Sequence, residues 1–180
     1  MRLLGERHVR RGLATLGVLG AGALVSACSS SAPAALSASQ ILRYSRDARV
    51  VHLTLDAALT SAYSGFNFDG YGSGAMTIDV PVGWRIDVTC TNESTTFTHS
   101  CAMVTDAAPS TSGAPFAFPG SVSANPVYGL AYGVSSAFSF VASRVGTYRI
   151  ACLVTGHELD GMWDWFDVTR GGTPKVRLSR

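Results

Sequence analysis

Short runs of alternating apolar and polar residues, divided by clusters of Gly, Pro, Asn and Ser, set the fold class of this chain. The runs are rich in β-branched and aromatic side chains, which fit the pleated surface of a sheet. Five such runs span residues 50–55, 75–80, 84–89, 138–141 and 147–151. Beyond residue 27, no run repeats its apolar residues with the 3.6-residue period of a capped helix. The sequence therefore predicts an all-β domain, an antiparallel sandwich or barrel.

The first 27 residues have the pattern of an export signal. Four arginines precede an apolar stretch rich in Gly and Ala, from Gly12 to Ala27. The small residues before Cys28 resemble a bacterial lipobox, in which a peptidase cuts ahead of the cysteine and the thiol carries lipid. We expect residues 1–27 to be removed and the protein to be lipid-anchored through Cys28 to the outer face of the cytoplasmic membrane, or periplasmic. An ordinary signal with a chance cysteine and an uncleaved anchor are the alternatives, and the pair Arg10-Arg11 leaves twin-arginine export open.

The chain that remains after residue 27 is nearly neutral. Residues 1–27 hold four of the fourteen Lys and Arg residues and one of the twelve Asp and Glu residues, so ten basic and eleven acidic residues remain, a formal charge of −1. No basic stripe of the kind that nucleic-acid binding needs is left, so we expect no nucleic-acid partner. Residues 28–43 predict a flexible tether, residues 44–169 a single domain and residues 170–180 a C-terminal tail.

Two cysteines in the middle of the chain predict a disulfide. Alternation along the run that ends at Cys90 points this residue to the same inward face as Ile86 and Val88. If the next strand begins near His99, then Cys101 also points inward. Two inward cysteines in an exported protein favour a bond across the two layers, worth about 3 kcal/mol by loop closure. Two buried free thiols, or Cys101 as a metal ligand beside His99, are the alternatives.

A thiol, an imidazole and a thioether stand at even intervals near the C-terminus, at Cys152, His157 and Met162, and a glycine precedes both the histidine and the methionine. His99 offers a second imidazole. A thiolate and two imidazoles in one plane, with a long, weak thioether bond on the axis, suit both Cu(I) and Cu(II). This set predicts one copper ion in a type 1 site. The alternative is a buried free cysteine beside an incidental histidine and a core methionine.

A metal held by four protein ligands has no open position for substrate, which favours electron transfer over catalysis. A multicopper enzyme would need more histidines than the remaining His52, and a binuclear centre would need a second cysteine beside Cys152. A copper carrier or copper-binding structural module remains the alternative. His157, on an exposed loop, is the expected site of electron entry and exit.

Each side chain near the segment from Cys152 to Met162 has two possible roles. Apolar residues would form a collar on which a redox partner docks weakly, or would simply be packed in the core. They are Leu153, Leu159, Trp163 and the segment 116–119. Glu158 and Asp160 would orient a basic partner or, as we expect, be solvated loop charges.

Motifs along the domain occur in the order found in one known family. They are Gly65–Gly70 (Gly-Phe-Asn-Phe-Asp-Gly), Ile78–Trp84, Phe97–His99, Gly146–Tyr148, Gly156–His157 and Gly161–Trp163. Over roughly residues 50–169 the chain resembles the sulfocyanins, which are cupredoxins, and its C-x4-H-x4-M loop is similar to that of the rusticyanins.

The resemblance implies a Greek-key cupredoxin sandwich in which His99, Cys152 and His157 are equatorial copper ligands and Met162 is the axial one. It also implies a place in a respiratory chain, with a cytochrome or terminal oxidase as redox partner. Ser100 departs from the usual cupredoxin asparagine, whose amide ties the two ligand loops together. The tie is therefore expected to be weaker, or to be rebuilt through the serine hydroxyl.

Overall fold

The computed structural model describes residues 32–105, 108–111 and 114–179. The predicted signal, residues 1–27, and the predicted lipid attachment at Cys28 lie outside these residues. Among the described residues, no helix combines the length and the hydropathy that crossing a membrane requires.

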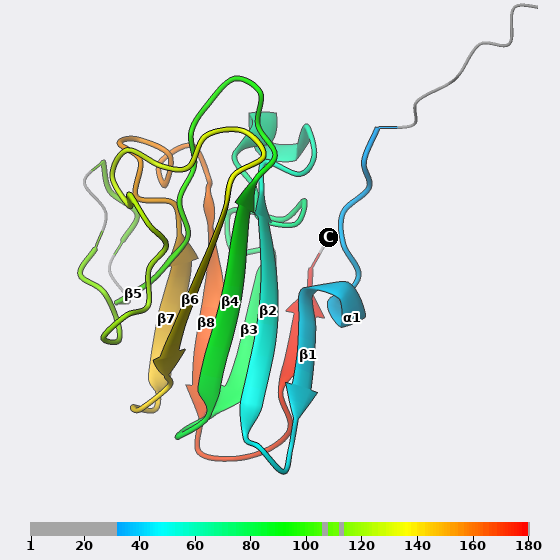
Figure 1. The fold of residues 1–180 in the computed structure, drawn as a ribbon, viewed down its shortest axis with the longest axis vertical. Helices are drawn as coiled ribbons and strands as arrows, with labels where there is room; N and C mark the ends of the chain where they lie inside the picture. Colours follow the sequence, from blue (N-terminus) through cyan, green and yellow to red (C-terminus); the bar gives the residue numbers. More distant parts are fainter. Residues whose placement is uncertain (1–31, 106–107, 112–113, 180) are drawn as a thin grey trace, which may run out of the picture. The chain divides into compact units, whose positions relative to one another are not determined.

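Two β-sheets packed face to face make up the described domain (Figure 1). The four-stranded sheet has the order β1-β2-β4-β6, with bounds Leu42–Ser45, Val50–Ala57, Arg85–Asn92 and Ser135–Val141. The five-stranded sheet has the order β5-β7-β8-β3-β9, with bounds Ala102–Thr105, Gly146–Ala151, Trp163–Thr169, Met76–Pro81 and Lys175–Leu178. The described helices are one turn each, α1 at Ala38–Ile41 and the 3-10 helix η1 at Ala62–Gly65. The predicted all-β sandwich is confirmed.

Both sheets are mixed, which corrects the expectation of purely antiparallel pairing. Strands β2 and β4 pair in parallel, and so do β3 and β8, while the other neighbours are antiparallel. Alternation has a period of two residues in either arrangement. The sequence pattern therefore predicts the strands but not the direction in which their neighbours run.

Alternating side chains from both sheets fill the space between the layers. In β4, Ile86, Val88 and Cys90 are buried, as alternation predicted. Cys90 forms a disulfide with Cys101, the residue just before β5, with the two Cα atoms 6.0 Å apart. The predicted bond across the layers is confirmed. It lies at the same end of the sandwich as the connection that carries His99.

The ordered domain extends beyond both of the boundaries expected from sequence. The predicted tether, residues 28–43, contains α1 and the start of β1, because the aliphatic side chains of Ile41 and Leu42 are buried in the core. The predicted C-terminal tail, residues 170–180, contains β9, which pairs with the edge of β3.

Residues 35–36 are also docked rather than free. The backbone N–H of Leu36 donates to the carbonyl of Asp69 at 2.9 Å, and the hydroxyl of Tyr71 donates to the carbonyl of Leu36 at 3.0 Å. Ala35 lies against Gly70, where an added Cβ would come within 2.5 Å of the Cβ of Ala35. We call residues 35–36 the N-terminal strap.

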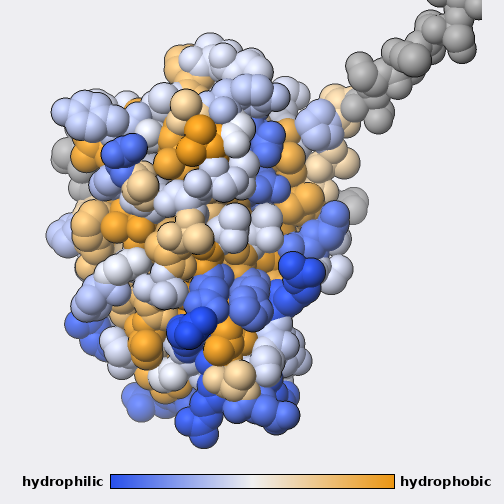
Figure 2. Space-filling view, viewed as in Figure 1, coloured by the Kyte–Doolittle hydropathy of each residue, from blue (hydrophilic) through white to orange (hydrophobic). Residues whose placement is uncertain are grey.

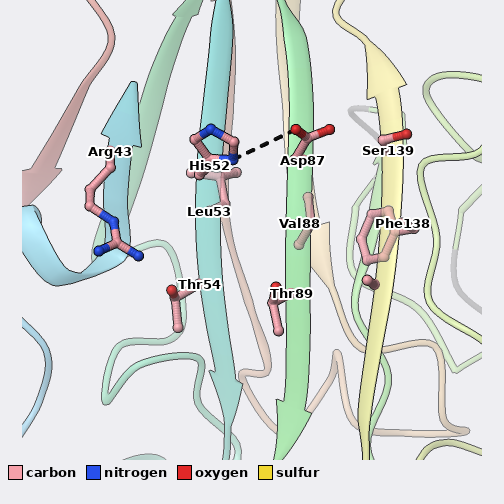
Figure 3. Close-up of a pocket in the computed structure, with 10 residues that line it drawn as sticks. Arg43, His52, Leu53, Thr54, Asp87, Val88, Thr89, Phe138 and Ser139 are labelled. Atoms are coloured by element: carbon pink, nitrogen blue, oxygen red, sulfur yellow. Dashed lines mark ion pairs between the residues drawn. The ribbon is translucent and has the colours of Figure 1, made fainter. Parts of the chain in front are cut away.

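The outer face of the four-stranded sheet is polar. Figure 2 shows hydrophilic side chains gathered toward the lower half of this face. A shallow depression of about 460 Å³ lies on the sheet, and Figure 3 shows the side chains of β1, β2, β4 and β6 that line it. His52 lies there, 3.6 Å from Asp87. This histidine is therefore on the solvent face of the sheet and takes no part in the ligand set.

Replacing Gly70 with Ala tests whether the strap contributes to stability. Both Gly70 (φ +90°) and Gly83 (φ +82°) have left-handed backbone, which costs a residue with a Cβ about 1–2 kcal/mol, but only Gly70 lacks room for one. We expect Gly70→Ala to lower the free energy of urea unfolding by more than Gly83→Ala does. Equal losses in the two variants would show that the strap contributes nothing.

Candidate metal centre

Two connections at one end of the sandwich, the upper end in Figure 1, supply the predicted ligands. His99 lies between β4 and β5 and is held by a pair of backbone hydrogen bonds with Leu130, at 3.3 and 2.7 Å. The other three residues lie in the β7–β8 connection, from Cys152 to Met162, which we call the ligand loop. The loop closes on itself, since the N–H of Cys152 donates to the carbonyl of Met162 and the N–H of Met162 donates to the carbonyl of His157.

Three of the predicted ligand atoms converge on one point. The Nδ1 atoms of His99 and His157 lie 3.1 Å apart, and the Sγ of Cys152 lies 3.9 Å from the first and 3.3 Å from the second. In a triangle with these sides, the point equidistant from the corners lies about 2.0 Å from each, close to the bond lengths of transition metals to imidazole nitrogen and thiolate sulfur. The three residues form a metal-binding cluster, and the donor set fits copper.

The ligand residues are almost entirely shielded from solvent. Cys152 and Met162 have no exposed surface, His99 is 1% exposed and His157 is 7% exposed. Among the described cysteines, Cys152 is the one outside the disulfide. The sequence predicted all four residues, and the structure brings them together at one end of the sandwich.

The glycines of the ligand loop allow its tight path. Gly156 (φ +87°) and Gly161 (φ +97°) have backbone conformations that side chains disfavour, as expected from their places before His157 and Met162. At Gly161 an added Cβ would also lie 2.6 Å from the hydroxyl oxygen of Ser73.

Ser100 rebuilds the tie between the two connections. Its backbone N–H donates to the Sγ of Cys152 at 3.3 Å, and its hydroxyl oxygen accepts the N–H of Leu153 at 2.9 Å. The same hydroxyl lies 3.8 Å from the Sγ. The sequence left open a weaker tie or one rebuilt through the serine hydroxyl. In the structure the tie is rebuilt, through both the hydroxyl and the backbone N–H of Ser100.

Burial sets the protonation of the ligands. It lowers the pKa of His99 to about 4, with a further contribution from His157, and it lowers the pKa of His157 against the opposing charge of Asp160. Burial raises the pKa of the Cys152 thiol, while hydrogen bonds from the backbones of Ser100 and Val154 lower it. At pH 7 both imidazoles are therefore neutral, with lone pairs ready for a metal, and the free thiol keeps its proton.

Two phenylalanines cover the histidines. The ring of Phe66 lies edge-on to His157, with centroids 5.0 Å apart, and is 6.2 Å from His99. Phe97 stacks on Phe66 and lies 6.2 Å from His157. Phe97 is 51% exposed, so it presents apolar surface beside the least buried ligand.

The surroundings of the loop divide the candidate collar and correct one expectation. Phe118 is buried in the main core, Leu153 is buried in a smaller cluster against which Trp163 packs, and Phe116 and Leu159 are 49% and 58% exposed. Asp160 is exposed, as expected. Glu158, expected to be a solvated charge, is 1% exposed, with its Oε1 3.0 Å from Nη1 of Arg149.

Sequence reasoning missed the partner of Glu158 because Arg149 alternates with core residues in β7. Tyr148 and Ile150 point into the sandwich, so alternation places Arg149 on the outer face of its sheet. Part of the long connection between β5 and β6 packs on this outer face, where Ala114 and Val122 lie against a small buried cluster that includes Ala151 of β7. The length of that connection was the sequence feature that could have indicated a covered outer face, because so long a segment has to pack on some surface of the domain.

The comparisons with known proteins agree with this geometry. Residues 37–173 match the family described as the sulfocyanin (SoxE) domain. The chain belongs to the sulfocyanin family. It is 27% identical over 128 residues to the sulfocyanin of Sulfolobus acidocaldarius, which covers 67% of this chain and 64% of that protein. The match thus spans somewhat less than two thirds of that relative's length.

One solved structure supports the same fold, a rusticyanin variant with a TM-score of 0.51 at 19% identity, covering 72% of this chain and 87% of that one. Reduced auracyanin from Roseiflexus castenholzii is matched with a TM-score of 0.47 at 21% identity, covering 66% of this chain and 96% of that one. With family and geometry together, His99, Cys152, His157 and Met162 are the ligand set of one type 1 copper ion in a cupredoxin.

Copper uptake should release about one proton per ion at pH 7, because a metal-bound cysteine is a thiolate. The proton comes from Cys152, whose raised pKa keeps the thiol protonated, and none comes from the histidines, whose lowered pKa values leave them neutral. The number should rise as the pH falls toward about 4, where His99 is protonated in the copper-free protein. Anaerobic Cu(I) titration calorimetry in buffers of different ionisation enthalpy counts the protons. Release of two at pH 7 would contradict neutral imidazoles.

Proposed function

We propose that this sulfocyanin-family protein is a one-electron carrier of a respiratory chain. In this proposal it is exported, held by a lipid on Cys28 at the outer face of the cytoplasmic membrane, and exchanges electrons with redox proteins such as a cytochrome or a terminal oxidase. The single observation that carries the proposal is the closed, buried ligand set, in which the four donors come from the chain itself.

A closed set favours electron transfer over catalysis. Bound copper would supply a one-electron couple between Cu(II) and Cu(I). Because the four ligand side chains are at most 7% exposed, a substrate has no room to approach between them. An enzyme with a metal at its centre keeps a coordination position open for substrate or water.

The protein part of the site holds its ligands in one geometry. The ligand loop is closed by its own backbone hydrogen bonds, Ser100 joins it to the His99 connection, and Phe66 packs against both histidines. Ligands that do not move between the two oxidation states lower the reorganisation that accompanies each transfer. The weak thioether donor of Met162 and the apolar surroundings favour Cu(I), which raises the reduction potential.

Electrons would enter and leave through His157. It is the most exposed of the four ligands. The exposed ring of Phe97 packs beside it, and the exposed Leu159 follows it by two residues in the loop. Apolar surface of this kind suits weak docking by a partner with an apolar face around its own redox centre. The near-neutral charge of the chain after residue 27 adds little long-range steering.

The location rests on the sequence of the N-terminus. The arginines, the apolar stretch and the small residues before Cys28 support export and lipid attachment. The disulfide between Cys90 and Cys101 is compatible with an oxidising compartment.

Substituting Met162 tests the axial role on which the redox proposal depends. Met162→Leu removes the thioether and should raise the reduction potential, while Met162→Gln offers a harder oxygen donor and should lower it. We expect each shift to reach about 59 mV or more, which is a tenfold change in the ratio of Cu(I) to Cu(II) affinity. Spectroelectrochemical titration of the copper-loaded proteins measures both potentials.

Met76→Leu is the matched control, because Met76 is equally buried in the same core but lies outside the ligand loop. It should leave the potential unchanged. If neither Met162 variant moves the potential, the axial assignment is wrong. If the unsubstituted protein binds copper but does not cycle reversibly, the protein holds copper without carrying electrons.

A further inference from the structure

A buried ion pair lies directly behind the ligand loop. Arg149 and Glu158 are each 1% exposed, and Nη1 of the first lies 3.0 Å from Oε1 of the second. The three guanidinium nitrogens of Arg149 and Oε1 of Glu158 are buried without a hydrogen-bond partner among the described residues, so the contact between Nη1 and Oε1 is an ion pair and not a hydrogen bond. The charge of the guanidinium is therefore balanced mainly by this one carboxylate.

The pair connects a rigid strand to the centre of the ligand loop. Arg149 belongs to β7, three residues before Cys152, and Glu158 directly follows His157. The guanidinium also lies 5.9 Å from the ring centroid of Trp163, the first residue of β8. The strands on both sides of the loop thus hold the arginine that contacts its middle.

A third segment closes around the same carboxylate. The backbone N–H of Ser110 donates to Oε2 of Glu158 at 3.3 Å, and the N–H of Gly156 donates to the carbonyl of Thr111 at 3.3 Å. Glu158 is therefore contacted at both oxygens, by the ion pair at Oε1 and by the hydrogen bond at Oε2. With its neighbour fixed in this way, His157 has little freedom to rotate away from the copper position.

The pair is also close to the ligands along the chain. Arg149 lies three residues before Cys152, and Glu158 directly follows His157. Both side chains are buried, so solvent screens their charges poorly. Burial raises the pKa of Glu158, and the charge of Arg149 offsets part of that rise. Burying two charges is costly compared with packing apolar side chains of the same volume, so stability alone does not account for the pair.

We propose that Arg149 and Glu158 are a positioning pair that holds the ligand loop in its copper-binding geometry before the metal arrives and balances charge beside the copper centre. This inference rests on the proposed redox function, because it concerns the potential of the same site. Arg149 and Glu158 act through His157 and Cys152 and are not ligands themselves.

The charge part of the proposal predicts shifts of opposite sign. Glu158→Gln keeps the shape of the side chain but leaves Arg149 unbalanced, which should raise the reduction potential by disfavouring Cu(II). Arg149→Gln leaves the carboxylate unbalanced and should lower it. The double variant restores neutrality, so its potential should lie closer to that of the unsubstituted protein than either single variant does. Arg149→Lys, which keeps the charge, should restore the potential.

The positioning part is measured without copper. Hydrogen exchange of the copper-free protein should show loop amides from His157 to Gly161 exchanging at least tenfold faster in Glu158→Gln and Arg149→Gln, while β2 and β4 keep their protection. Arg149→Lys should recover only part of this protection, because an ammonium keeps the charge but not the flat guanidinium surface beside the ring of Trp163.

Arg177→Gln is the control, since it breaks exposed ion pairs with Asp79 in β3 and Asp167 in β8, neither of which is a ligand. It should change neither the potential nor the exchange of the loop. Shifts of the same sign in both single variants, or loop exchange equal to that of the control, would overturn the proposal. Because the unsubstituted protein is measured in the same series, failure of its copper to cycle would instead contradict the proposed function.

Discussion

The copper site depends on one contact between two segments that are far apart in sequence, the hydrogen bond from the N–H of Ser100 to the Sγ of Cys152. This bond places the His99 connection against the ligand loop, and it is reinforced by the N–H of Leu153 donating to the serine hydroxyl. Once the two segments meet, three ligand atoms lie at the corners of a triangle that a copper ion fits. The disulfide, the backbone hydrogen bonds of the ligand loop and the packing of Phe66 hold this contact in place.

Each support acts on a different side. The disulfide ties Cys101, the residue after Ser100, to Cys90 in the four-stranded sheet, so the end of the His99 connection next to β5 is fixed. The closed backbone of the ligand loop fixes Cys152 and Met162 from the other side. Packing of Phe66 on His157 removes water from the front of the site. A centre supported in this way changes little between oxidation states, which is what a fast one-electron carrier needs.

The ligand set and the disulfide could be predicted from sequence because their chemistry is carried by a few residue types. The spacing of Cys152, His157 and Met162 predicted a copper site once His99 was added to it. Alternation pointed Cys90 and Cys101 to the inside, and this favoured their disulfide over two buried free thiols. The parallel pairings, β9 and the Arg149–Glu158 pair could not be predicted, because they depend on which distant segment covers which face. Alternation shows that Arg149 points away from the core, but only the folded β5–β6 connection shows that it is buried there.

X-ray absorption at the copper edge, in both oxidation states, tests the central claim of a preformed, closed site most directly. We expect one copper per chain, with one short sulfur and two nitrogen neighbours whose distances change little on reduction, and no added oxygen ligand. A coordination shell that gains water, loses a histidine or rearranges between Cu(II) and Cu(I) would contradict it.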